Sequence, residues 1–244
     1  MMLRSLFAAA TLLACAAGPV DLPPPPPPPS GIAVRLLFIG NSLTYTYDVP
    51  DLVARMTTLS GRETPQVTSM TEASFALEDH WTMGGALAAL RTGQFDRVIL
   101  QQGPSTLAES GVQLRQWSIT WANEARQYGA RPGLYVVWPP AGGNLDAGIA
   151  NHEAAASAAN AALYPVGEAW REVWRVDPAM PLYGPDQFHP SPHGAWLAAL
   201  IITAMVHDRP VTEFANLFPG TISSAQEAKL RAAATTAIRL YGRR

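Results

Sequence analysis

The chain has 244 residues, of which 48% are hydrophobic and 15% are charged, and its formal net charge is -2. About thirty residues at the front look like an export signal and a linker, and the roughly 210 that remain suit one domain with a full core. Such a weakly charged chain creates no global field for nucleic acid or an anionic membrane surface, so we expect a small or neutral partner and no nucleic acid.

The first fifteen residues have the features of a bacterial lipoprotein signal peptide. The apolar run over 6–14 is too short to span a bilayer but has the length of a signal-peptide core. The only cysteine, Cys15, ends the sequence LLAC, which resembles the lipobox where bacterial lipoproteins are cut and acylated. We predict a signal peptide over 1–15, export, and a lipid anchor at Cys15 on the periplasmic or cell-surface side. Cleavage at a nearby small-residue site, giving a soluble secreted protein, is the alternative.

Residues 16–31 form a proline-rich linker. Seven consecutive prolines, 23–29, favour an extended polyproline II segment of roughly 20 Å. Its place between the signal and the domain favours a spacer over a recognition tract for a proline-binding module. The folded domain is therefore predicted over 32–244.

From Val34 onward, short apolar runs alternate with longer amphipathic segments, which is typical of βαβ units and a parallel sheet covered on both faces. This pattern predicts the α/β class, as a three-layer α/β/α sandwich with about five parallel strands. In such sheets ligands bind beyond the carboxyl ends of the strands, so chemistry is expected just after the first three. The predicted strands lie at 34–39, 66–71, 97–102, 133–138 and 163–166, and the predicted helices at 50–60, 77–91, 111–128, 146–161, 192–207 and 224–241.

Ser42 follows the first predicted strand, in the sequence GNS over 40–42. The glycine lets the backbone turn sharply as it leaves the sheet, and the serine is then displayed at the sheet's edge with its own N–H free to help bind an anion. Taken alone, this triplet is more often an ordinary turn, because turns prefer these residues.

Asp186 and His189 lie three residues apart in the sequence DQFHPS. Asp186 could accept a hydrogen bond from one ring nitrogen of His189, leaving the other nitrogen to act as a base. Pro190 disfavours a helical conformation at His189, which places the pair on a loop. Alone, this spacing is more often a surface ion pair or a helix lead-in. A serine nucleophile needs a base, however, and the base needs a partner that fixes its tautomer. Ser42, His189 and Asp186 together supply these three groups.

In this order, GNS after the first strand and DxxHPS before a late helix resemble the SGNH (GDSL-like) hydrolases. The segments LEDHW at 77–81 and VILQQGPS at 98–105 also look like parts of bacterial members, and the resemblance extends from about 34 to 204. It implies the flavodoxin-like fold of that superfamily. It also implies a serine esterase in which Ser42 is the nucleophile, His189 the base and Asp186 its partner.

The resemblance further implies an oxyanion hole with three donors, the first being the backbone N–H of Ser42. The second is expected from a glycine, but ASFA stands at 73–76, where Ser74 is the best-placed residue to donate a backbone N–H. A positive φ at that position would strain a serine.

The third oxyanion donor is expected from an asparagine side chain, but QQGPS stands at 101–105. This arrangement is similar to carbohydrate esterases of the superfamily in which a glutamine before the glycine is the donor. We therefore predict Gln102, with Gln101 or Ser105 as the alternatives.

The remaining histidines give no sign of a metal site. His80 and its neighbour Trp81 fall on a predicted helix and are interpreted as packing or helix-to-loop contacts. His152, His193 and His207 have no spacing for a shared metal, and the chain has no His-x-x-x-His pair. No metal and no cofactor is predicted.

The sequence thus predicts an exported serine esterase that hydrolyses small acyl esters or O-acylated glycans and meets the membrane only through its lipid anchor. Two alternatives remain open. One is an acyltransferase with the same triad, and the other is a catalytically impaired glycan-binding surface protein, for which the missing second-block glycine is the best support.

Overall fold

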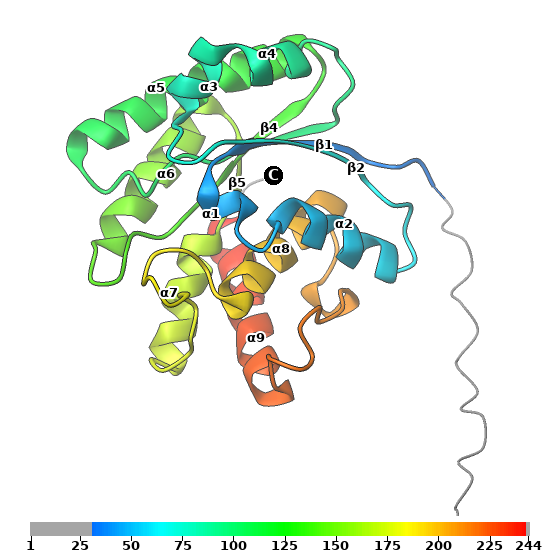
Figure 1. The fold of residues 1–244 in the computed structure, drawn as a ribbon, viewed down its shortest axis with the longest axis vertical. Coiled ribbons are helices and arrows are strands. Elements are labelled where there is room, and N and C mark those ends of the chain that lie inside the picture. The colour runs from blue at the N-terminus through cyan, green and yellow to red at the C-terminus, as the bar shows by residue number, and fades with distance from the viewer. Residues whose placement is uncertain (1–30, 243–244) are drawn as a thin grey trace, which may run out of the picture.

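A computed structural model of the chain describes residues 31–242, which form a three-layer α/β/α sandwich (Figure 1). The predicted signal peptide, Cys15 and all but the last residue of the predicted linker lie outside the described residues. The predicted α/β class and the five-stranded parallel sheet are confirmed. The strands are β1 (Arg35–Gly40), β2 (Gln66–Thr71), β3 (Arg97–Leu100), β4 (Arg131–Tyr135) and β5 (Ala162–Tyr164).

The strand order β2-β1-β3-β4-β5 places a topological switch point at β1. The chain leaves β1 to form β2 on one side of it and then crosses to form β3 on the other side. Ligands of open α/β sheets bind in the crevice that such a reversal creates beyond the carboxyl ends of the strands. Ser42 follows β1 and Gln102 follows β3, so the sheet brings both sequence motifs to this crevice.

Helices cover both faces of the sheet (Figure 1). Alternate residues of β1 enter different cores: Leu36 and Phe38 point to one face, and Leu37 and Ile39 to the other, as in any strand buried on both sides. The first face carries α2 (Val49–Leu59), α7 (Val166–Val176), α8 (Pro192–His207) and α9 (Ser224–Tyr241), and the second carries α3 (Leu77–Met83), α4 (Gly85–Leu90), α5 (Ala108–Gln127) and α6 (Leu145–Ala159).

Helix α8 is the most buried helix of the described chain, with every residue from His193 to Val206 buried. A helix that is apolar all round must be enclosed, and α8 packs among the sheet, α2, α7 and α9. Pro192 begins the helix, where its missing N–H costs nothing, and Ser191 caps it by accepting hydrogen bonds from the His193 and Gly194 N–H groups. The loop that precedes α8 is therefore attached to the core.

Two helical predictions were wrong in detail. The helix predicted over 77–91 is split into α3 and α4 at Gly84, whose left-handed backbone (φ 80°) ends the first helix. Helix α7 was missed, because the apolar residues beside Pro165 were interpreted as a strand alone. The buried residues of α7 nevertheless recur at helical spacing, which is the signal that would have identified it: Val166, Ala169, Trp170 and Val173.

Candidate active site

Ser42 begins the short helix α1 (Ser42–Tyr45) directly after β1. Asn41 caps this helix: its Oδ1 accepts a hydrogen bond from the Leu43 N–H at 3.1 Å, and its Nδ2 donates to the Phe75 carbonyl at 3.0 Å. The backbone N–H of Ser42 donates to no hydrogen bond within residues 31–242, because the first N–H groups of a helix have no acceptor inside it. The N–H beside the serine hydroxyl is therefore available to an anion.

Buried Gln101 holds the turn that carries Ser42. Its Oε1 accepts hydrogen bonds from the Asn41 N–H and the Thr44 hydroxyl, both at 2.8 Å, and its Nε2 donates to the Gln102 carbonyl at 2.6 Å. A Cβ on Gly40 would lie 2.5 Å from the Gln101 Oε1, so glycine is required here by space rather than by a positive φ. Gln101 is thus engaged in shaping the turn.

The structure brings Ser42, His189 and Asp186 together, although Ser42 is far from the other two in sequence. Nε2 of His189 lies 2.8 Å from the Ser42 hydroxyl, and Nδ1 lies 2.5 Å from Oδ2 of Asp186. With Nδ1 protonated and donating to the carboxylate, Nε2 is left to accept the serine proton. The structure therefore places the three predicted side chains in hydrogen-bonding contact, in the order Ser42, His189 and Asp186.

The carboxylate of Asp186 is held in its charged form. Its hydrogen bond with His189 lowers the pKa of the Asp186 carboxyl below its usual range, helped by the Phe188 and His189 backbone N–H groups, which donate to Oδ1. Both side chains still reach solvent, with exposed fractions of 31% for His189 and 51% for Asp186. The site is open to water.

An aromatic cluster under the loop fixes the position of His189. Trp138 stacks on Trp170 with ring centroids 3.6 Å apart, and its Nε1 donates to the Phe188 carbonyl at 2.9 Å. Tyr183 packs edge-on against Trp170, and its hydroxyl donates to the Pro139 carbonyl at 2.6 Å. Sequence reasoning missed this support, because it depends on a contact between two distant loops.

Ser74 lies between β2 and α3 with a φ of 65°, the left-handed conformation that favours glycine. Ser74 therefore has the strained backbone that was expected from the sequence for a serine in the place of a glycine. The Ser74 N–H donates to no hydrogen bond in the described part of the chain. The next residue, Phe75, accepts the hydrogen bond from Asn41, which joins this loop to the turn that carries Ser42.

Gln102 follows β3 and is buried, with its side-chain amide only loosely engaged. Its Oε1 accepts a hydrogen bond from the Leu77 N–H at 3.3 Å, and its Nε2 lies 3.4 Å from the Ser105 hydroxyl. The two alternatives for a third donor are more committed, since Gln101 supports the turn and the Ser105 hydroxyl donates to the Gly103 carbonyl at 3.0 Å. Gln102 has the most available N–H among the three.

Backbone strain gathers around the site. Seven non-glycine residues within 31–242 have a positive φ, and two of them, Asn160 and Asp208, are simple C-caps of helices. The other five lie on the loops that follow α1, β2 and β3 and on the His189 loop. Strained backbone persists where surrounding structure enforces it, and it clusters at functional sites. These five are Tyr47, Asp48, Ser74, Ser105 and Gln187.

His80 contacts both the loop before its own helix, at Phe75, and the end of β1, directly before the turn that carries Ser42. Its Nε2–H donates to the Gly40 carbonyl at 2.8 Å, and its ring meets Phe75 edge-on. Burial lowers the pKa of the His80 imidazole, so the ring is neutral at physiological pH. His80 therefore braces the end of β1. Its neighbour Trp81 packs against Trp121.

Within residues 31–242, no cluster of three or more histidine, cysteine, aspartate or glutamate side chains could hold a metal ion. Every helix of the same residues is too short or too polar to cross a bilayer.

Solved structures resemble the chain, although no family model and no curated protein matches it. A candidate SGNH hydrolase from Slackia heliotrinireducens is 28% identical, with a TM-score of 0.62 over 72% of this chain and 100% of that one. The protein has the SGNH hydrolase fold. The resemblance inferred from the sequence is thus confirmed, and a hydrolase is supported.

Two further solved structures, both under 25% identical to this chain, show a likeness of fold alone. A DUF4886 family protein from Bacteroides uniformis is 18% identical, with a TM-score of 0.67 over 86% of this chain and 96% of that one. A variant of an acetyl-xylooligosaccharide esterase from Geobacillus is 16% identical, with a TM-score of 0.52 over 73% of this chain and 95% of that one.

Proposed function

We propose that this protein is a serine esterase in which Ser42, His189 and Asp186 form the catalytic triad. One observation carries the proposal: the His189 ring bridges the Ser42 hydroxyl, at 2.8 Å, and the Asp186 carboxylate, at 2.5 Å. A chance ion pair would satisfy only one side of this bridge. The position of Ser42 at the switch point of the sheet adds independent support.

In the first half of the reaction, the Ser42 oxygen attacks the ester carbonyl while its proton passes to Nε2 of His189. The charged Asp186 stabilises the imidazolium that results. His189 then gives the proton to the departing alcohol, which leaves an acyl group on Ser42. In the second half, water loses a proton to His189 and attacks the acyl group, and the returned proton restores Ser42.

The negative oxygen of each tetrahedral intermediate needs donors that are already in place. We assign this role to the backbone N–H groups of Ser42 and Ser74 and to Nε2 of Gln102. The two backbone groups have no other acceptor in the described structure, and the Gln102 amide has only a long contact with Ser105. Donors that are already fixed in place need not reorganise as the negative charge develops.

The substrate class that fits best is a short acyl ester on a bulky alcohol, such as an O-acylated glycan. The exposure of His189 and Asp186 leaves room for a large leaving group. Tyr45 lies three residues after Ser42 on the same short helix, hence on the same side, and is 43% exposed, so its ring can stack on a sugar. The fold neighbour named as an acetyl-xylooligosaccharide esterase acts on this kind of compound.

The test of the triad uses Ser42→Ala with p-nitrophenyl acetate, acetylated xylan and a fluorophosphonate probe. Wild-type protein should hydrolyse the esters and be labelled on Ser42, and the variant should do neither. Unchanged turnover in the variant would end the proposal. An intact Ser42 after exposure of wild-type protein to the probe would favour the glycan-binding alternative.

Acyl transfer is distinguished by adding a sugar acceptor. The solvent exposure of the His189–Asp186 pair favours hydrolysis, because a transferase must keep water from the acyl-enzyme. Turnover that rises steeply with acceptor, and yields acylated sugar rather than free acid, would instead identify a transferase.

We also propose that the protein is a lipoprotein anchored through Cys15. The sequence around Cys15 is the support for this proposal. Metabolic labelling with a fatty acid should mark the wild-type protein, and Cys15→Ser should abolish the label and release the protein from membranes. A labelled Cys15→Ser variant would contradict the anchor.

A further inference from the structure

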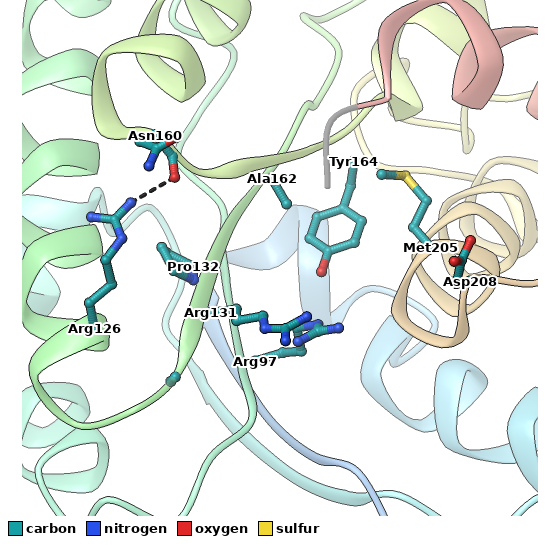
Figure 2. A pocket seen from close by; sticks show the side chains of 10 residues that line it. Arg97, Arg126, Arg131, Pro132, Asn160, Ala162, Tyr164, Met205 and Asp208 are labelled. Atoms are coloured by element: carbon teal, nitrogen blue, oxygen red, sulfur yellow. Dashed lines mark hydrogen bonds between the residues drawn. The ribbon is translucent and has the colours of Figure 1, made fainter.

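A cavity lies at the opposite edge of the sheet from Ser42. Its volume is about 560 Å³, and it opens at the amino ends of three strands, beside Arg97, Arg131 and Ala162 (Figure 2). Ser42 follows the carboxyl end of β1, so this cavity takes no part in the proposed hydrolysis. Its size falls in the range of small-molecule sites, which runs from about 300 to about 1,000 Å³.

Two arginines face each other in this cavity. Arg97 begins β3 and Arg131 begins β4, and the two are direct partners in the parallel register, so their side chains leave the sheet on the same side. Neither guanidinium has an ion pair or a side-chain hydrogen bond within residues 31–242. Like charges placed directly opposite on neighbouring strands destabilise a sheet. The pair therefore carries a repulsion that an anion would relieve.

The hydroxyl of Tyr164 points toward the same two arginines (Figure 2). Only 2% of Tyr164 is exposed, and its side chain forms part of the cavity wall. Gly133 makes this orientation possible, because a Cβ there would lie 2.5 Å from the Tyr164 ring. Burial raises the pKa of Tyr164 to about 12, so the hydroxyl keeps its proton and can donate it in a hydrogen bond.

Two further charged side chains line the cavity. Arg126 adds positive charge, but its Nη2 already donates to the Ala159 and Asn160 carbonyls at 2.5 and 2.7 Å. Asp208 contributes a carboxylate next to Met205 (Figure 2). The cavity is lined by three cations and one anion, so its lining has a net positive charge. Among the cations, Arg97 and Arg131 are the two whose guanidinium groups form neither an ion pair nor a hydrogen bond within residues 31–242.

We propose that this cavity binds the phosphate or carboxylate group of a small molecule. Arg97 and Arg131 donate hydrogen bonds to the anion, and the Tyr164 hydroxyl is a third donor. Planar guanidinium groups match the spacing of phosphate and carboxylate oxygens and hold them through paired hydrogen bonds. The cavity has space for a sugar-sized group beyond the anion. This site is independent of the esterase proposal.

Isothermal titration calorimetry with glucose 6-phosphate and glucuronate tests the site, with glucose as the neutral comparison. Wild-type protein should bind at least one anionic sugar, more weakly at high salt, and should not bind glucose. The double variant Arg97→Gln/Arg131→Gln should lose at least about 10-fold in affinity, and Tyr164→Phe should lose less. A preference for one sugar identifies the anion as phosphate or carboxylate.

Three controls separate binding from folding and from catalysis. Arg115→Gln removes an exposed arginine on α5 and should bind as wild type does. Ser42→Ala should also bind normally, since the two sites lie at opposite edges of the sheet. Without ligand, the double variant should unfold at the same urea concentration as wild type or a higher one, because a repulsion has been removed. Absence of binding at about 10 mM of either sugar, or equal binding by the double variant, would overturn the proposal.

Discussion

The buried carboxyl of Glu168 should make the protein less stable as the pH rises. Glu168 lies in the first turn of α7, is 0% exposed, and neither of its oxygens has a hydrogen-bond partner from another described residue. Burial raises the pKa of this carboxyl from 4.5 to about 8. The folded protein thus keeps a proton that the unfolded chain releases.

The sign and size of this effect follow from linkage. The stabilisation is complete below the unfolded pKa of 4.5 and is lost as the pH rises toward the folded pKa of about 8. Each pH unit inside that window removes about 1.4 kcal/mol from the free energy of unfolding, so about 3 kcal/mol is lost between about pH 5 and about pH 7.5. Glu168→Gln has nearly the same shape and no charge, and it should remove this slope.

Urea unfolding at both pH values, for wild type and Glu168→Gln, measures the difference in slope. Glu172→Gln serves as the matched control, because Glu172 lies on the same helix but forms an ion pair with Arg175, whose side chain is exposed. This variant should keep the wild-type pH dependence. Equal slopes for wild type and Glu168→Gln would refute the reasoning, since the carboxyl would then ionise in the folded state as easily as in the unfolded chain.

Three further predictions concern the site. Asp186→Asn should lower kcat by about 10³-fold or more, because the amide favours the wrong tautomer of His189. Steady-state assays with p-nitrophenyl acetate measure this effect, and near-normal turnover would remove Asp186 from the triad. Gln102→Ala should lower kcat by about 10²- to 10³-fold with little change in KM, and an effect confined to KM would assign Gln102 to substrate binding. His80→Phe leaves the Gly40 carbonyl without one of its donors, so the free energy of unfolding should fall by about 1 kcal/mol, and kcat should fall with KM unchanged. Urea unfolding measures the first effect and the same ester assay the second. An unaltered kcat would limit His80 to a structural role.

The sheet could be predicted because strands buried on both faces form nearly continuous apolar runs, as β1 does. The Asp186–His189 pair could be predicted because its geometry is local to one turn. Helix α7 was not separated from β5, because a short apolar segment beside a proline suits either a strand end or a helix start. The helical spacing of the apolar residues from Val166 to Val173 was the signal that distinguishes the two. The sequence placed Ser42 and His189 on separate loops, and only the packing of α8 brings them to 2.8 Å.

Other parts of the molecule depend on contacts that no local pattern reveals. Gln101 was a candidate oxyanion donor, but its amide is committed to the turn under Ser42 by three hydrogen bonds. Trp138 supports the His189 loop through a single bond from its indole N–H to a carbonyl of that loop. The pairing of Arg97 with Arg131 requires the register of β3 and β4, which only the folded sheet defines.

The five strained residues around the site imply that activity and folding need not fail together. Each strained backbone stores on the order of 1–3 kcal/mol that the surrounding packing must hold in place. When denaturant or heat loosens that packing, relaxation at residues such as Ser74 and Gln187 releases stored energy, while the buried strands gain nothing by moving. During unfolding, the protein should therefore pass through a compact state in which the sheet is still formed but the enzyme is inactive. Ester turnover should disappear before the far-ultraviolet circular dichroism signal of the helices does.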